Sequence, residues 1–274
     1  MADGESRYEA KKTLRESGEH IWSFSTGRIH SFVTRTDYQR HTLHFINWAR
    51  REHDINRLDR LDERADELAT QYLNERIALG YSAYTVQAER AALRMFFSSR
   101  ALAVTVTPPS RRRENITRSR GPAKHDKHFQ PEHWQTQINF LKACGLRRSE
   151  LRDLFVREIF RDEEERLVVY VRNGKGGRSR RVVVIPGQEQ AILSVIQDRP
   201  PDEHVFTHLA KHMDIHSYRR AYAQALYLHY APGRNLPPAE GRLKRSDYDY
   251  EAALKVSWSL GHNRVDVVLR HYIR

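Results

Sequence analysis

The stretch that decides the fold of the second half of the chain is Gly145-Leu146-Arg147-Arg148-Ser149-Glu150-Leu151. Gly145 ends a helix that we predict over residues 131–143, because glycine readily takes the left-handed conformation that closes a helix. A second, short helix is predicted over residues 149–155. Arg147 then lies at the start of this helix, beside free backbone N–H groups, where it is well placed to hold a phosphate. A capped helix with surface arginines explains the same residues, and we favour this interpretation for the motif taken alone.

A β-hairpin is predicted downstream of this turn. Residues 167–171 and 180–185 are rich in β-branched side chains, and Asn173-Gly174 between them is a strong hairpin signal. Lys175 at the tip of the hairpin can reach into a groove and donate a proton, although most lysines in such turns are merely exposed. Further helices are predicted over residues 188–198, 215–230 and 251–260, with a long loop over 231–249.

Several histidines follow the hairpin. His216 and Arg219 are three residues apart near the start of a predicted helix, so they share one face and can address one ligand. His208, His212 and His216 are spaced i, i+4, i+8, which on one continuous helix would form a metal-binding face. Asp214 is a predicted N-cap that interrupts this face, so we do not predict a zinc site.

The last motif is Leu260-Gly261-His262, a helix end followed by a histidine, with Tyr272 ten residues further on. The chain has 13 tyrosines, so Tyr272 taken alone carries no information. Tyr248 and Tyr250 are rival nucleophiles, but both precede the histidine and lie in a predicted loop. We therefore rank both below Tyr272.

The first half of the chain predicts a small all-helical domain. One helix is expected to start at Thr36 or Asp37, a second to run from about Leu61 to Gly80, and a third to be capped by Ser82. The third helix is expected to place Tyr84, Ala88, Ala91 and Met95 on one apolar stripe. The predicted domains are an N-terminal tail (1–20), a helical domain (21–105), a basic linker (106–128) and a mixed α/β domain (129–274).

The charge of the chain favours a polyanionic partner. Lys and Arg number 47 against 35 Asp and Glu, a formal net charge of +12, and basic side chains near a phosphate backbone release its counterions. Cys144 is the single cysteine, which excludes an intrachain disulfide and a Cys-rich zinc site. No run approaches the roughly 18 apolar residues of a membrane span, so we expect no membrane partner and a cytoplasmic, nucleoid-associated protein. The linker residues that could follow a DNA backbone are Arg111, Arg112, Arg113, Arg118 and Arg120, although a solvated tether explains the same composition.

Together, these motifs resemble those of the tyrosine recombinase, or phage integrase, family. The resemblance spans residues 129–274, and the helical domain over 21–105 is similar to the SAM-like core-binding domain that precedes the catalytic domain in this family. It implies a mainly α fold with a small β-hairpin (α+β), with the two domains forming a C-shaped clamp around DNA. The motifs that carry it are, in chain order, residues 145–151 with the first arginine, the hairpin lysine Lys175, His216 with Arg219, and His262 with Tyr272.

The resemblance implies a site-specific recombinase or integrase that cleaves and rejoins DNA through a 3′-phosphotyrosine. Tyr272 would be the nucleophile, and Arg147 and Arg219 would clamp the non-bridging oxygens of the phosphate. Lys175 would protonate the 5′-oxygen as it leaves, and His216 would help to remove the phenol proton. No metal, cofactor or ATP is expected.

The remaining implied roles concern the phosphate and the partners. His262 would donate a hydrogen bond to the phosphate, and Glu150 would orient an arginine. The substrate would be a double-stranded DNA recombination site of a mobile element. The enzyme would be a homo-oligomer, a tetramer in the synaptic complex and a monomer when free.

Two features depart from the family pattern. Tyr272 follows His262 by ten residues, where many members have nine, and two residues, Ile273 and Arg274, follow it. The contact between subunits therefore stays open. The alternatives are a type IB topoisomerase-like enzyme, which uses the same residues, and a catalytically silent DNA-binding protein on the same fold. An RNA-binding module is a distant fourth, because no aromatic-rich sheet motif is visible.

Overall fold

The computed structural model describes residues 13, 16–18, 28–110, 129–175 and 177–274. The chain divides into two compact units, Met1–Ile116 and Thr117–Arg274, and the division falls inside the predicted linker. Each unit is described by itself, so the C-shaped clamp stays a prediction. The linker arginines named above, Arg111, Arg112, Arg113, Arg118 and Arg120, lie outside the described residues.

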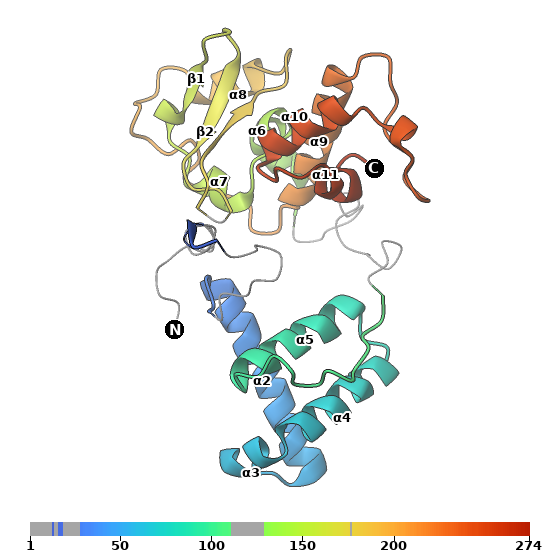
Figure 1. Cartoon of the computed structure of the whole chain (residues 1–274). Helices are drawn as coiled ribbons and strands as arrows, with labels where there is room; N and C mark the ends of the chain where they lie inside the picture. Colours follow the sequence, from blue (N-terminus) through green and yellow to red (C-terminus); the bar gives the residue numbers. More distant parts are fainter. Residues whose placement is uncertain (1–12, 14–15, 19–27, 111–128, 176) are drawn as a thin grey trace. The chain divides into compact units, whose positions relative to one another are not determined.

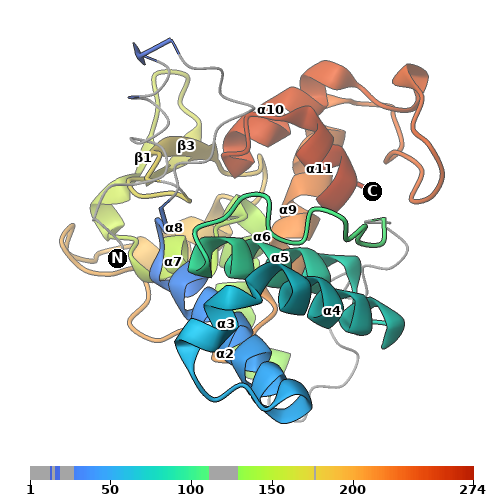
Figure 2. The same cartoon turned by 60° about the horizontal axis from the view of Figure 1, so that its bottom comes forward.

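The described part of the first unit is a small helical bundle (Figure 1). An aromatic cluster lies at its centre, where the ring centroids of Phe45 and Tyr72 are 5.4 Å apart and those of Trp48 and Tyr72 are 5.3 Å apart. Figure 2 shows α2, α4 and α5 packed side by side, in agreement with their contacts. The helices are α2 (Phe32–His53), α3 (Leu58–Glu63), α4 (Ala65–Ala78) and α5 (Ala83–Phe96).

The starting points of these helices only partly match the sequence prediction. The prediction that the first helix starts at Thr36 or Asp37 was wrong, because Ser31 caps α2 by accepting a hydrogen bond from the Thr34 N–H at 3.1 Å. The predicted second helix is broken into α3 and α4 around Arg64. The predicted Ser82 cap is confirmed, since its hydroxyl accepts from the Thr85 N–H at 3.2 Å.

The apolar stripe predicted for the third helix was also wrong. Tyr84 is 42% exposed, and Ala88, Ala91 and Met95 are only half-buried. A different face of α5 is turned toward the core, because Glu89 forms a buried ion pair with Arg76, with Oε1 of Glu89 2.7 Å from Nη2 of Arg76. The buried residues of α5 are Val86, Glu89, Ala92 and Leu93.

The second unit packs helices against a small antiparallel sheet of order β1-β2-β3. The predicted hairpin is confirmed as β2 and β3, with Val169 opposite Val182. The fold is mainly α with a small sheet, as expected from the sequence. The helices and strands are α6 (Gln135–Cys144), α7 (Arg148–Arg152), β1 (Ile159–Arg161), β2 (Leu167–Val171), β3 (Arg180–Val183), α8 (Gln190–Ile196), α9 (Ile215–Tyr230), α10 (Tyr250–Leu260) and α11 (Val265–His271), with short 3-10 turns at Pro131–Trp134, Val156–Glu158 and Arg245–Asp247.

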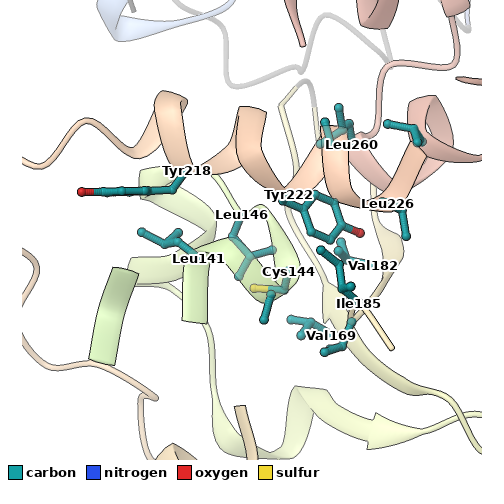
Figure 3. Close-up of a cluster of buried hydrophobic side chains, with 14 of the residues drawn as sticks. Leu141, Cys144, Leu146, Val169, Val182, Ile185, Tyr218, Tyr222, Leu226 and Leu260 are labelled. Atoms are coloured by element: carbon teal, nitrogen blue, oxygen red, sulfur yellow. The ribbon is translucent and has the colours of Figure 1, made fainter. Parts of the chain in front are cut away.

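Helix α9 crosses the centre of this unit and has the bounds that the sequence predicted. Its N-cap, Asp214, accepts from the Ser217 N–H at 3.3 Å, so the helix starts after His208 and His212 and the three histidines share no helical face. Figure 3 shows Tyr222 and Leu226 of α9 in one cluster with Cys144 and strand residues Val169 and Val182. The Tyr222 hydroxyl donates to the Val183 carbonyl at 2.7 Å and lies 2.6 Å from Ser259 Oγ. The core therefore ties α9 to both the sheet and α10.

Strand β1 and helix α11 were not predicted from the sequence. Helix α7 is shorter than expected, ending at Arg152, and α10 begins at Tyr250, where Asp249 accepts from the Ala252 N–H at 2.9 Å. None of the described helices is long and apolar enough to span a membrane.

Candidate active site

Gly145 sets the position of the first arginine. It ends α6 with a φ of 59°, and a Cβ at this position would lie 2.2 Å from Cδ1 of Tyr222. Only glycine both adopts the left-handed backbone readily and fits where there is no room for a Cβ. The chain turns at once into α7, with Arg147 as the N-cap residue, so Arg147 lies at the helix start that the sequence indicated.

The carboxylate of Glu150 is the buried counter-charge of this region. Oε1 accepts hydrogen bonds from Nη1 of Arg147 at 2.6 Å and from Nη1 of Arg180 at 2.9 Å. Oε2 accepts from the Arg147 backbone N–H at 2.8 Å and from Nη2 of Arg180 at 2.7 Å. Burial raises the pKa of Glu150, but the hydrogen bond from Arg180 and the charges of both arginines outweigh burial and lower it to about 2. Glu150 is therefore ionised and orients two arginines.

Arg219 is the second predicted arginine, and its side chain is 1% exposed. Nη1 donates to the Gly145 carbonyl, and Nη2 donates at 2.5 Å to the Leu260 carbonyl, which also accepts from Arg147 Nη2 at 3.2 Å. Burial and the charge of Arg147 lower the pKa of Arg219 to about 10, so it stays cationic at neutral pH. Its Nε atom is buried without a hydrogen-bond partner among the described residues. A buried cationic donor that lacks an acceptor is suited to bind an anion.

His262 lies between Tyr272 and Arg147. Nε2 of His262 lies 3.3 Å from Oη of Tyr272 and 3.5 Å from Nη2 of Arg147. Cζ of Arg219 lies 5.5 Å from the centre of the Tyr272 ring, which is 6% exposed. Burial and the charge of Arg147 lower the pKa of His262 to about 3. The imidazole is therefore neutral at neutral pH, with one nitrogen that donates and one that accepts.

Lys175 and His216 are related to this group through charge. Lys175 is exposed in the turn between β2 and β3, and His216 lies in the first turn of α9, three residues before Arg219. Partial desolvation and the charge of Arg219 lower the pKa of His216, and Arg147 and Lys175 add to the effect. Lys175 also contributes to the lowered pKa of His262. Hydrogen bonds and ring contacts thus join Arg147, Arg219, His262 and Tyr272, whereas Lys175 and His216 are related to them through the effects of charge on these pKa values.

The rival tyrosines lie elsewhere. The rings of Tyr248 and Tyr250 lie 5.3 and 5.2 Å from Cζ of Arg245, in the turn before α10. Within the described part of the chain, neither has a hydrogen bond or ring contact with Arg147 or Arg219. The tyrosine beside the arginine pair is Tyr272.

Arg180 was not predicted from the sequence as a site residue. This residue shares a face of β3 with Val182, which is 1% exposed, because residues two apart in a strand point the same way. An arginine on an inward-facing strand position is a signal that it meets a buried carboxylate, but the sequence alone does not say which one. Arg180 therefore belongs to the site through Glu150.

In chemical terms, the site combines a phenol, two fixed guanidiniums, a neutral imidazole and an exposed lysine. Guanidiniums bind and neutralise phosphate oxygens in a fixed geometry, and a phenol beside them can attack a bound phosphorus. This arrangement suits phosphoryl transfer.

A comparison with solved structures places the chain in the same fold as a known integrase. It resembles the integrase of transposon Tn1549 in complex with a circular intermediate DNA, with 16% identity and a TM-score of 0.53 over 97% of this chain and 94% of that one. A complex of the same integrase with transposon right end DNA matches with 14% identity and a TM-score of 0.47, over 97% and 93% of the two chains. XerA recombinase matches with 15% identity and a TM-score of 0.32, over 97% and 91%.

No family model matches the sequence, and no curated protein matches it. At this level of identity the first of these matches shows a shared fold. It agrees with the fold class that the sequence motifs implied.

Proposed function

We propose that this chain is a site-specific DNA recombinase or integrase with Tyr272 as its nucleophile. The observation that carries the proposal is the position of Tyr272. Its hydroxyl lies 3.3 Å from Nε2 of His262, which lies 3.5 Å from Nη2 of the half-buried Arg147, and its ring centre lies 5.5 Å from Cζ of the buried Arg219. The Tn1549 integrase, which shares the fold, is bound to DNA in its structure. The net charge of +12 further favours duplex DNA as the substrate.

The proposed reaction exchanges one phosphodiester for another. Tyr272 Oη forms a bond to phosphorus, its proton passes to His216, and the bond from phosphorus to the 5′-oxygen breaks as Lys175 protonates that oxygen. Arg147 and Arg219 neutralise the non-bridging oxygens. The products are a 3′-phosphotyrosine and a 5′-hydroxyl.

The second half of the reaction reverses the first. A 5′-hydroxyl of another strand attacks the phosphotyrosine and releases Tyr272. Because the number of phosphate ester bonds is unchanged, the exchange needs no ATP. We propose further that the substrate is a recombination site of a mobile element and that a tetramer of the chain carries out the exchange.

The neutral state of His262 refines its proposed role. A neutral imidazole can donate one hydrogen bond to the phosphate while its second nitrogen accepts. Its distance of 3.3 Å from Tyr272 Oη also places it within reach of the phenol proton. His262 is therefore a second candidate for the base, beside His216.

Covalent capture tests the proposal. The protein is incubated with sheared genomic DNA of its source organism, denatured with detergent, and the protein–DNA adducts are isolated and their DNA sequenced. We expect adducts at a defined DNA sequence for the wild type and for the control Tyr248→Phe, and none for Tyr272→Phe. Adducts that persist in Tyr272→Phe would overturn the assignment.

The same preparation separates the alternatives. Relaxation of supercoiled plasmid without strand exchange between two captured sites would favour a type IB topoisomerase-like enzyme. Binding to the DNA without any adduct would favour a catalytically silent DNA-binding protein.

A further inference from the structure

Arg180 links three segments of the candidate site. Its guanidinium donates to both oxygens of Glu150, at 2.9 and 2.7 Å, and its Nε donates to the Ser259 carbonyl at 2.9 Å. Its side chain is 9% exposed. Arg180 is the first residue of β3. Its hydrogen bonds link the start of this strand to Glu150 of α7 and to Ser259 in the last turn of α10.

Two glycines make room for the Arg180 side chain. A Cβ at Gly174 would lie 2.9 Å from Nη1 of Arg180, and a Cβ at Gly261 would lie 2.9 Å from its Cδ. Gly174 directly precedes Lys175, and Gly261 directly precedes His262. Arg180 therefore packs against the backbone that carries each of these two site residues.

Protein acceptors hold the Arg180 guanidinium on all three of its nitrogens. Nε donates to the Ser259 carbonyl, and one N–H of each Nη atom donates to the Glu150 carboxylate. Arg219 differs, since its buried Nε has no partner among the described residues. The bonds of Arg180 instead fix the geometry of neighbouring segments.

We infer that Arg180 is a positioning residue that holds the Lys175 turn in place for leaving-group protonation; this inference rests on the proposed function. Backbone hydrogen bonds from the Gly174 N–H to the Arg178 carbonyl at 2.8 Å and from the Gly177 N–H to the Gly174 carbonyl at 2.9 Å close the turn on itself. The guanidinium of Arg180 lies beside Gly174, where a Cβ would be 2.9 Å from Nη1, so it limits how the closed turn can shift relative to β3. The hydrogen bonds of Arg180 to Glu150 and Ser259 keep the turn at a fixed position relative to Arg147 and His262.

The chemistry of the leaving group provides a specific test. When the bond from phosphorus to the 5′-oxygen breaks, the oxygen needs the proton that Lys175 supplies. A sulfur atom in the same position leaves as a thiolate, which is far more stable than an alkoxide and needs no acid. A variant that has lost the positioned acid should therefore cleave the sulfur substrate nearly as well as the wild type does.

The experiment compares cleavage rates on two duplexes of the DNA sequence recovered by covalent capture, one with the natural 5′-oxygen and one with a bridging 5′-sulfur. The variants are Arg180→Met and Arg180→Lys, and Lys175→Ala is the positive reference. Arg181→Met is the matched control, because Arg181 is exposed on the same strand and pairs with the exposed Glu163. Thermal melting checks that each variant is folded.

For Arg180→Met we expect cleavage of the oxygen substrate to slow about 100-fold, the scale of general acid catalysis, and cleavage of the sulfur substrate to slow less than about 5-fold. Arg180→Lys should lie between Arg180→Met and the wild type, since lysine keeps the charge but not the planar fork. The ratio of the two rates is taken on one preparation, so a partly unfolded sample does not change it.

Equal slowing on both substrates would overturn the inference, because Arg180 would then act through Glu150 and Arg147 alone. An unchanged rate on the oxygen substrate would overturn it as well. Failure of the proposed function looks different, since the wild type itself would then form no adduct on either duplex.

Discussion

Nε2 of His262 lies 3.3 Å from the hydroxyl oxygen of Tyr272, although the two side chains follow different helices. Gly261 ends α10 and directs His262 back toward the arginines, and α11 then returns the chain so that Tyr272 reaches the same place. The spacing of ten residues is filled by a two-turn helix. The geometry thus explains how a short segment brings His262 and Tyr272 to the same place, beside Arg147 and Arg219.

Lowering the pH should destabilise the second unit through His262. An unfolded histidine takes up a proton near pH 6.5, whereas folded His262 does so near pH 3. Between these values the unfolded chain binds more protons, so the free energy of unfolding falls as the pH falls. From pH 7 to pH 5 we expect a loss of about 1 kcal/mol from this group, after allowance for solvent screening. Between pH 7 and pH 5, the melting temperature of the wild type should therefore fall relative to that of His262→Gln. A difference between the two melting temperatures that does not change with pH would count against the lowered pKa of His262.

Replacing Glu150 by glutamine should destabilise the second unit. Arg147 and Arg180 would lose the charge of their shared carboxylate while remaining largely buried, a loss of about 3 kcal/mol for a buried pair. Thermal melting measures it. The control is Asp153→Asn, because Asp153 pairs with Arg152 on the surface, where such pairs contribute roughly 0–1 kcal/mol. Similar melting temperatures for the two variants would contradict the central role given to Glu150.

Gly145→Ala should lower the free energy of unfolding of the second unit by more than the strain of an alanine in a left-handed backbone explains. Gly145 and Gly187 both have positive φ, of 59° and 85°, but a Cβ at Gly187 meets nothing within 4 Å, whereas at Gly145 it overlaps Tyr222. We expect a loss of about 1 kcal/mol for Gly187→Ala and of about 3 kcal/mol or more for Gly145→Ala, because overpacking adds to the backbone strain. Chemical denaturation curves of the two variants provide the comparison, and equal losses would show that the Tyr222 contact relaxes freely.

Loss of either arginine proposed to bind the phosphate, Arg147 or Arg219, should slow cleavage, but the two losses should lower the stability of the second unit to different degrees. Arg147→Ala should leave DNA binding nearly unchanged, slow cleavage by about 100- to 1,000-fold, as for the loss of one oxyanion donor, and lower the melting temperature only modestly, because Arg180 still pairs with Glu150 and Arg219 still donates to the Leu260 carbonyl. Arg219→Ala should slow cleavage as well but should lower the melting temperature more, because the Gly145 and Leu260 carbonyls lose a buried donor. Gel-shift, adduct and melting assays separate these effects. Complete loss of DNA binding in a folded Arg147→Ala variant would contradict its role.

Local signals in the sequence were sufficient to predict much of the second unit. Helix α9 was predicted at its observed bounds, because Asp214 is a strong cap and the helix is long. The hairpin followed from Asn173-Gly174 between two β-branched runs. Helix α11 was missed, since Val265, Val267 and Val268 favour strand over helix, and its conformation is set by packing on α10.

The contacts that complete the site are non-local, and the sequence could not supply them. Arg180 and Glu150 are thirty residues apart, and the inward orientation of Arg180 depends on the register of β3. In the first unit, the inward turn of Glu89 toward Arg76 likewise overrode the apolar stripe predicted for α5. In both places an ion pair between residues distant in the sequence holds charged side chains inside the unit.

The most direct test of the central claim is to identify the amino acid that becomes joined to DNA. The wild-type adduct is digested with nuclease and protease, and the peptide that retains a nucleotide is sequenced by mass spectrometry. The account predicts a single modified peptide with the nucleotide on Tyr272, attached through a 3′-phosphate. A nucleotide on Tyr248, on Tyr250 or on any other side chain would contradict it.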